Sequence, residues 1–538
     1  MSEITKTSDQ RPRRADRIVW LLFAVVIVAV YFFALDLPLL GPDEPRYAQV
    51  AREMFLRGDW VTPTLGGANW FEKPALLYWL QIAAYKLFGV SEFAARFGSA
   101  LFGLGTIFSL WILGRSLATE NTVKHRGTEN ENKEIFPAFS INSVAGNDFA
   151  NWLALIAASS IGLLVFSRGA SFDIILTFPL TASLVSFFIF DQTKKESAFT
   201  FYFSLFAFYF FIGLALLAKG LIGIVFPFAI VAFYFLLSRK LPNKTFIFSL
   251  FWGTILSLIV AASWYLPMYQ AHGWRFIDEF FVQHHFARYT SNKYQHPQPF
   301  TFFFWVLPLM TLPWLPFFLA AIWDFLKVQS SKSKVQSQET SARLRLSAPS
   351  IRIFAFAWLL VPLVFFTFSG SKLPGYILPA LPAALVLTAD YISRFTEKSR
   401  PRKYAVQLIA FMTFVAVAVA LRFFVPAYAQ ADTTKYLIET ANAAGYADAK
   451  ILNLHAVSHN AEFYGAGRLV RDADGKLKKY FGVTEILEEI KQQNGKTVLV
   501  LVPPEYLHQL KESVLIESKV LGKSGELAIV AVMGTPSS

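Results

Sequence analysis

Long apolar stretches alternate with short polar segments up to residue 424, and this pattern predicts a polytopic α-helical membrane protein. A helix needs about 20 apolar residues to cross the hydrocarbon core of a bilayer. Eleven runs approach this length: 17–35, 97–117, 150–167, 174–190, 198–217, 221–238, 244–266, 301–324, 351–369, 376–394 and 403–424. The stretch 75–88 is also apolar, and it could lie in the membrane or on its surface.

After residue 424 the pattern changes to short apolar segments separated by charged ones. AKILNLHAV, KTVLVLVPP and ELAIVAVMG are typical of strands, whereas VTEILEEIKQQNG and YLHQLKESV are typical of helices. We therefore expect a cytoplasmic tail at 1–16 and a transmembrane domain at 17–424 that contains a long first outer loop at 36–96. A soluble α/β domain should follow at 425–538.

The composition agrees with a membrane protein. Of the 538 residues, 54% are hydrophobic and 16% are charged, whereas soluble domains have roughly 25% charged residues. The balance excludes a disordered chain and disfavours a purely soluble enzyme. The sequence contains no cysteine, which excludes a disulfide scaffold, thiolate metal sites and a cysteine nucleophile.

The net charge of +13 could indicate a nucleic-acid partner. With the N-terminus inside, however, about half of the 50 Lys and Arg residues fall in segments on the inner side. The positive-inside rule of membrane proteins accounts for such a distribution without any nucleic acid. Eleven spans then place residues 36–96 and the C-terminal domain on the outer side.

The first outer loop is dense in charged and aromatic residues. Residues 45–57 predict an amphipathic helix on the membrane surface, since Pro45 suits a first helical turn. Asp43 and Glu44 stand just before this helix, so the carboxylate of Asp43 could cap the helix, act as a catalytic base, or do both. Glu44 beside it is better explained as a solvated or metal-facing group than as a catalytic one.

Other ionisable residues stand at the outer ends of later runs. They are Arg168, Asp173, Lys219, Lys372 and a histidine-rich segment at 267–300. Lys219 could simply extend to the interface, and the histidines could be ordinary interfacial polarity. Because all these segments face the same side, they could instead form one charged cavity above an apolar groove. Such a cavity suits an amphiphile with a phosphate head and a polyprenyl tail.

The motifs resemble a known family. GPDEPRYAQVAREMFLRGDW followed by FEKPALLYWL is similar to the first periplasmic loop of protein O-mannosyltransferase-like GT-C glycosyltransferases, in particular the branch with lipid A aminoarabinose transferase. RGASFDIILTF, LLAKGLIG, HHFARYT and SKLPGYILPALP resemble further family segments in the same order. The resemblance covers about residues 15–395. The inner loop 118–148 departs from it as an apparent insertion, and relatives have about two more spans.

This resemblance implies a GT-C fold of about 11–13 spans in the inner membrane, a periplasmic active site and a polyprenyl-phosphate-linked sugar as donor. Asp43 would be the catalytic carboxylate and Asp173 a second acidic residue near the sugar or acceptor. Donor phosphate contacts would come from Lys73, Arg288 and Tyr376. The remaining candidates are Glu44, Arg46, Lys219 and Lys372 for substrate binding, with Glu72 and His285 for a divalent metal ion.

We therefore expect an inverting glycosyltransferase. Its acceptor stays open: lipid A, another envelope lipid, a cell-wall glycan or a protein would all fit. A flippase for polyprenyl-linked sugars is the main alternative, because it also needs basic residues over an apolar groove. An oligosaccharide ligase is a second alternative. The charge lies on one face and no clear repeat is visible, which favours an enzyme over a transporter.

Overall fold

The structure is a computed structural model that describes residues 10–125, 144–193, 197–286, 298–332, 349–473 and 475–535. By its contacts the chain divides into two compact units. Unit 1 comprises Met1–Phe33, Glu72–Leu76 and Ser99–Ala416, and unit 2 comprises Ala34–Phe71, Leu77–Gly98 and Val417–Ser538. Most of the first polar loop thus belongs to the same unit as the C-terminal segment. Each unit is described by itself.

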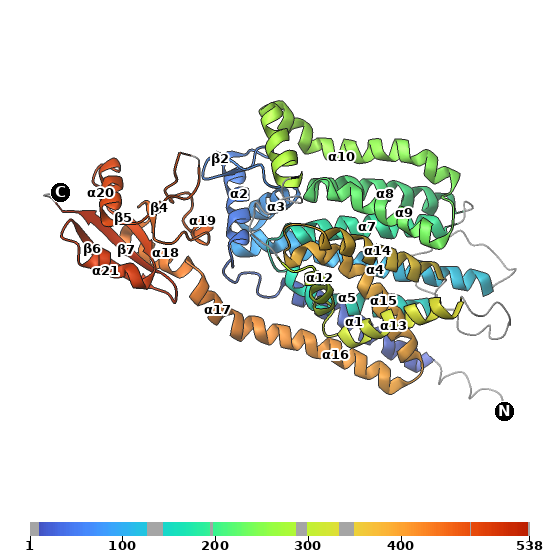
Figure 1. Cartoon of the computed structure of the whole chain (residues 1–538). Helices are drawn as coiled ribbons and strands as arrows, with labels where there is room; N and C mark the ends of the chain where they lie inside the picture. Colours follow the sequence, from blue (N-terminus) through green and yellow to red (C-terminus); the bar gives the residue numbers. More distant parts are fainter. Residues whose placement is uncertain are drawn as a thin grey trace. The chain divides into compact units, whose positions relative to one another are not determined.

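Unit 1 is built from apolar helices (Figure 1). Each of the eleven predicted runs is helical over most of its length. The helices are α1 (Gln10–Phe32), α4 (Glu92–His125, which begins in unit 2), α5 (Val144–Ala158), α6 (Ile161–Phe166), α7 (Phe172–Gln192), α8 (Ala198–Lys219), α9 (Ile222–Ser238), α10 (Lys244–Ile277), η2 (Asp278–Phe286), α12 (Phe302–Met310), α13 (Leu315–Lys332), α14 (Pro349–Thr367), η3 (Pro374–Ala380), α15 (Leu381–Glu397) and α16 (Arg400–Val419).

Several of these helices could cross a membrane. Within the described residues, six helical stretches are long and apolar enough to span it, or seven if the bent pair α12 and α13 counts as one span. Three shorter apolar helices, α5, α9 and α14, coincide with further predicted runs. The chain is therefore a multi-pass membrane protein, and the number of eleven spans stays a prediction.

Aromatic side chains fill the space between the helices of unit 1. The ring of Phe187 on α7 lies 5.6 Å from that of Phe208 on α8 and 5.3 Å from that of Phe246 on α10. Phe354 on α14 stacks on the same ring at 6.1 Å. Ring pairs at such separations add to the energy of burial. Much of the phenylalanine content therefore serves interhelical packing.

Two predicted spans are broken in the structure. Residues 150–167 form two helices, α5 and α6, with the backbone of Ser160 extended between them. The hydroxyls of Ser159 and Ser160 bond backbone oxygens of the preceding turn. The backbone N–H of Ile161 is donated to the carbonyl of Leu312, 2.8 Å away. Residues 301–324 are likewise divided into α12 and α13, and the chain direction bends by 116° between these two helices.

Unit 2 contains the first loop and its helices. α2 (Asp43–Arg57) confirms the predicted amphipathic helix but begins two residues earlier, and it buries Tyr47, Val50, Ala51 and Met54 on one face. The short hairpin of β1 (Thr64–Leu65) and β2 (Ala68–Asn69) follows. α3 (Leu76–Phe88) then covers the stretch 75–88.

The C-terminal part of unit 2 is an α/β domain, as predicted. Its helices are α17 (Val425–Asp432), α18 (Lys435–Ala441), η5 (Asn442–Tyr446), α19 (Ala461–Tyr464), α20 (Val483–Gln492), η6 (Pro504–Tyr506) and α21 (Leu507–Lys511). Its strands are β3 (Ile451–Leu454), β4 (Lys479–Tyr480), β5 (Val498–Val502), β6 (Ile516–Lys523) and β7 (Ala528–Gly534). The strand order is β4-β3-β5-β7-β6, with β3 parallel to β4 and β5, and β7 antiparallel to β5 and β6.

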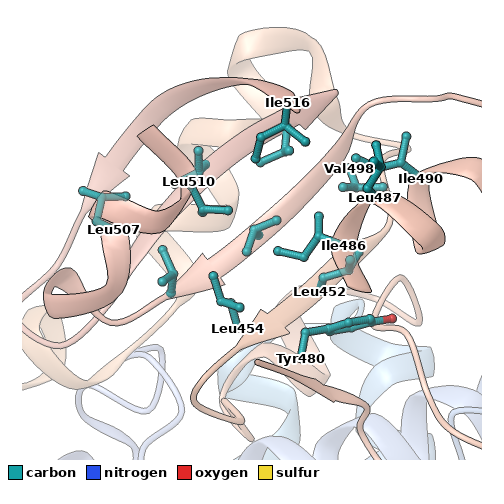
Figure 2. Packing of buried hydrophobic residues seen from close by; sticks show 14 of the residues in the cluster. Leu452, Leu454, Tyr480, Ile486, Leu487, Ile490, Val498, Leu507, Leu510 and Ile516 are labelled. Atoms are coloured by element: carbon teal, nitrogen blue, oxygen red, sulfur yellow. The ribbon is translucent and has the colours of Figure 1, made fainter. Parts of the chain in front are cut away.

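The central strands of this sheet, β3, β5 and most of β7, are buried on both faces. Leu452, Leu454 and Val500 pack against α20 and α21 on one face, as Figure 2 shows for the two leucines. Leu499 and Leu501 point to the other face, where they pack with α18. Burying one such side chain contributes roughly 1.5–3 kcal/mol. The two apolar layers explain why the strands read as continuous hydrophobic runs.

Candidate functional site

Asp43 occupies the first turn of α2. Its side chain is 56% exposed, and the guanidinium Nη2 of Arg46 donates to its Oδ1 over 3.0 Å. Arg46 also donates to the carbonyl of Pro42 at 3.2 Å, and its guanidinium lies 5.8 Å from the ring centre of Trp70. The helix N-terminus favours a negative charge at this position. Asp43 is therefore an accessible carboxylate held by one arginine.

The interpretation of Asp43 as a helix cap is not borne out. The N-cap residue of α2 is Pro42, and it makes no side-chain cap hydrogen bond. The carboxylate of Asp43 instead points to Arg46, one turn further along. An accessible carboxylate that is not used as a cap is available to contact a ligand.

Glu44 has a structural partner that the sequence did not indicate. Nε of Arg96 donates to its Oε1 at 3.1 Å and Nη2 donates to its Oε2 at 2.7 Å. The backbone N–H of Leu40 donates to the same Oε2 at 2.9 Å. Both carboxylate oxygens are thus engaged within unit 2, so Glu44 helps to shape the loop, and its substrate-binding role stays a prediction.

Three candidate residues from distant segments of unit 1 come together. Asp173 lies in the first turn of α7, Lys219 is the last residue of α8, and Tyr376 lies in η3. The ammonium group of Lys219 forms an ion pair with the carboxylate of Asp173, and it lies 5.0 Å from the ring centre of Tyr376. The prediction that these segments form one charged cluster is supported for this trio.

Gly375 allows the backbone of η3 to lie close to the carboxylate of Asp173. A Cβ atom at Gly375 would lie 1.9 Å from the Oδ2 of Asp173, which no side chain could tolerate without displacing the carboxylate. The LPGY motif therefore needs a glycine at this position for steric reasons. Lys372, which precedes it, is 8% exposed and donates from Nζ to the carbonyl of Gln298 at 3.3 Å.

Glu72 and Lys73 form an ion pair with each other, with Nζ and Oε1 separated by 2.9 Å. Both side chains are largely buried, at 14% and 12% exposure.

Glu72 is one of the two residues expected to hold a divalent metal ion, and the side chain of the other, His285, is not described. Among the described residues, the structure contains no group of three or more His, Asp or Glu side chains that could hold such an ion. Arg288 and His296 lie outside the described residues as well.

Arg168, which lies between α6 and α7, has a structural role. Its guanidinium donates to the carbonyl oxygens of Val30 and Phe33 at the end of α1. Basic side chains commonly satisfy the last carbonyls of a helix in this way. Arg168 and Arg96 were not assigned these roles because their partners lie far away in sequence; an arginine inside the apolar segment EFAARFGSA was the available signal for Arg96.

The chain is similar to known proteins in both sequence and structure. The family model of the dolichyl-phosphate-mannose-protein mannosyltransferases matches residues 18–123 and 144–277. The undecaprenyl phosphate-alpha-4-amino-4-deoxy-L-arabinose arabinosyl transferase of Shewanella sediminis is 30% identical over 412 residues, which is 74% of this chain and 65% of the relative. The protein of the same name from Yersinia enterocolitica is 29% identical over 391 residues, or 71% and 60% of the two chains. The chain thus spans somewhat less than two thirds of the length of these relatives.

Solved structures show the same fold. ArnT from Cupriavidus metallidurans bound to undecaprenyl phosphate matches with a TM-score of 0.73 at 21% identity, covering 95% of this chain and 97% of that chain. Its apo state matches with a TM-score of 0.71 at 20% identity, with the same coverage. The class of protein is therefore that of membrane proteins with the GT-C glycosyltransferase fold. Within this superfamily, the comparisons confirm the resemblance to the aminoarabinose transferase branch.

Proposed function

We propose that this protein is an inverting glycosyltransferase that moves a sugar from a polyprenyl-phosphate donor to an acceptor in the cell envelope. The relatives named as arabinosyl transferases and the ArnT structure bound to undecaprenyl phosphate support this donor class. The acceptor is lipid A, another envelope lipid or glycan, or a protein. Catalysis takes place on the periplasmic face of the inner membrane.

The observation that carries the proposal is the trio of Asp173, Lys219 and Tyr376. A cation and a phenol lie together at the ends of apolar helices, where a phosphate head would arrive with its tail among aromatic side chains. Charge-assisted hydrogen bonds to phosphate are the strong ones in proteins. Lys73, Arg288 and Lys372 supply further positive charge for the same head.

The chemistry needs one base. A polyprenyl phosphate is a weakly basic, already anionic leaving group, so it requires electrostatic stabilisation rather than a general acid. Asp43 accepts the proton of the acceptor hydroxyl as that oxygen attacks the anomeric carbon. Attack from the face opposite the phosphate forms the new glycosidic bond, breaks the bond to phosphate and inverts the anomeric centre. Arg46 orients the Asp43 carboxylate for this step.

The test is a mass-spectrometric comparison of envelope lipids and glycoconjugates in cells that lack the gene and carry either the wild-type copy or Asp43→Asn. We expect one species to gain a single sugar mass with the wild-type copy alone. That species names the sugar and the acceptor. If a polyprenyl-phosphate sugar instead changes sides of the membrane and Asp43→Asn behaves as wild type, the protein is a flippase.

A further inference from the structure

The loop that leads to Asp43 has almost no regular structure of its own. Residues 33–42 form turns and extended backbone between α1 and α2, yet Leu35 and Leu39 are buried. Buried backbone polar groups must find hydrogen-bond partners. From Leu35 to Gly41, side chains from other parts of unit 2 serve as such partners.

Arg96 satisfies the carbonyl groups. Beyond its two bonds to Glu44, it donates to the carbonyl oxygens of Leu35 and Pro38 at 3.1 and 2.9 Å, and also to that of Leu37. These five bonds use all five N–H donors of a guanidinium group. Arg96 comes from the start of α4, so it fixes the loop from within the N-terminal part of the chain.

Two N–H groups of the same loop are satisfied by the C-terminal domain. The N–H of Leu39 donates to the hydroxyl oxygen of Tyr464 at 2.8 Å, and the N–H of Gly41 donates to Oδ2 of Asp432 at 3.3 Å. Leu40 between them is bonded by Glu44, and Pro38 has no N–H. Leu39 and Gly41, which lie just before Pro42 and Asp43, are thus each bonded by a residue more than 390 positions away in the sequence.

Both C-terminal partners are themselves fixed. The hydroxyl of Tyr464 donates to Oε1 of Glu92 at 3.3 Å, and the ammonium group of Lys435 lies 2.7 Å from the same oxygen. Burial, together with the nearby charge of Glu92, raises the pKa of Tyr464 far above its usual range. The phenol therefore stays protonated and can donate one hydrogen bond while accepting the other. Asp432 is held by Asn460, whose Nδ2 donates to its backbone oxygen at 2.9 Å.

We propose that Tyr464 and Asp432 are positioning residues of the glycosyl transfer, which gives the C-terminal domain a direct part in catalysis. They fix the backbone just before Asp43, so that the carboxylate meets the acceptor hydroxyl in a reactive geometry. The inference rests on the proposed function and on Asp43 as the base. A misplacement of about 1 Å at a catalytic group can lower a rate by about a hundredfold.

The experiment uses the full-length protein in detergent with Tyr464→Phe and Asp432→Ala. Tyr464→Phe removes one oxygen atom. We expect kcat to fall between about ten- and hundredfold, with the dissociation constant of undecaprenyl phosphate unchanged within about twofold. Amide hydrogen exchange of peptides covering residues 37–42 should accelerate in both variants, whereas exchange in β5 should stay as in the wild type.

Tyr480→Phe is the matched control. Tyr480 lies in the same domain, is 1% exposed and donates to Oε2 of Glu489 at 2.7 Å, but it belongs to the core of the sheet. It should leave kcat and the exchange of residues 37–42 unchanged. If Tyr464→Phe retains the wild-type kcat, or if the loop amides stay protected, the proposal is wrong. A wild-type protein that transfers no sugar would refute the proposed function instead. The exchange data would still show whether Tyr464 and Asp432 fix residues 37–42.

Discussion

Lys219 is the residue whose surroundings most directly suggest phosphate binding. Its ammonium group is fixed by the carboxylate of Asp173 and by the face of the Tyr376 ring. A cation held between two groups loses little freedom when an anion arrives, which favours tight binding. The interpretation of Lys219 as a side chain that merely extends to the interface does not account for these contacts.

We expect Lys219→Met to weaken the binding of undecaprenyl phosphate by about tenfold or more, since a hydrogen bond to a charged group contributes about 1.5–3 kcal/mol. Titration of the purified protein with undecaprenyl phosphate, followed by intrinsic fluorescence, measures this change. Lys240→Met is a suitable control, because Lys240 is exposed beyond the end of α9. Equal affinities of the two variants would contradict a phosphate-binding role for Lys219.

At the same scale, the sequence predicted the residue types of the site better than their partners. Ionisable residues in apolar surroundings marked Asp173 and Lys219 as members of one site, the family resemblance added Tyr376, and the structure brings the three together. Their pairing could not be predicted, because three separate helices had to be placed first. The partner of Glu44 could not be predicted for the same reason, because Arg96 stands 52 positions away.

Among the elements, the hairpin of β1 and β2 is bonded by side chains of α2, and Glu53 makes three of these bonds. The carboxylate of Glu53 accepts hydrogen bonds from the N–H of Gly66 at 2.6 Å, the N–H of Gly67 at 3.2 Å and the hydroxyl of Thr64 at 2.7 Å. Two strands of two residues each cannot be stable alone. Glu53 therefore supplies much of what keeps this hairpin in place.

Glu53→Gln should loosen the hairpin, because a neutral amide cannot accept all three bonds with the strength of a carboxylate. We predict faster amide exchange at residues 64–69 by about tenfold, with α2 itself still protected. Glu488→Gln, on the exposed face of α20, serves as a control. Unchanged exchange in the hairpin would show that other contacts hold it.

Another set of elements, α13, α14 and α15, is joined by an ionic network. Asp390 pairs with Arg352 at 2.8 Å and with Arg394 at 3.1 Å, and Arg394 also pairs with Asp324 at 2.9 Å. Asp390 is buried, at 8% exposure. Removing one member leaves the remaining charges partly uncompensated.

Asp390→Asn should lower the free energy of unfolding by about 1–3 kcal/mol, less than for a fully buried pair because Asp324 is partly exposed. Thermal unfolding of the full-length protein in detergent measures the loss. Asp278→Asn, outside the network, is the control. A melting temperature that stays at the wild-type value would contradict a stabilising role for this network.

Regular elements were largely predictable from periodicity, and the exceptions have physical causes. All eleven apolar runs are helical, and the strands β3, β5 and β7 fall where continuous apolar residues predicted them. β6 was missed because it is an edge strand whose exposed positions carry charged residues, which hides the apolar pattern. The breaks within 150–167 and 301–324 meet each other through the bond from Ile161 N–H to the carbonyl of Leu312, a tertiary contact that a hydropathy pattern does not contain.

For the whole molecule, the proposed orientation can be tested directly because the sequence contains no cysteine. Single variants Lys511→Cys in the C-terminal domain and Lys240→Cys beyond α9 each place one thiol at an exposed position. A membrane-impermeant maleimide should label only Lys511→Cys in cells with a permeabilised outer membrane, and both variants after lysis. Labelling of Lys240→Cys without lysis would reverse the predicted topology.

The central claim is that Asp43 is the base of a glycosyl transfer, and the most direct measurement uses purified protein with a polyprenyl-phosphate sugar and an envelope lipid extract. Asp43→Asn should lower the transfer rate by about 10²–10⁴-fold, the usual contribution of a general base, while undecaprenyl phosphate binds as in the wild type. Asp36→Asn, an exposed aspartate of the same loop, should transfer at the wild-type rate. Full transfer activity in Asp43→Asn would contradict the account.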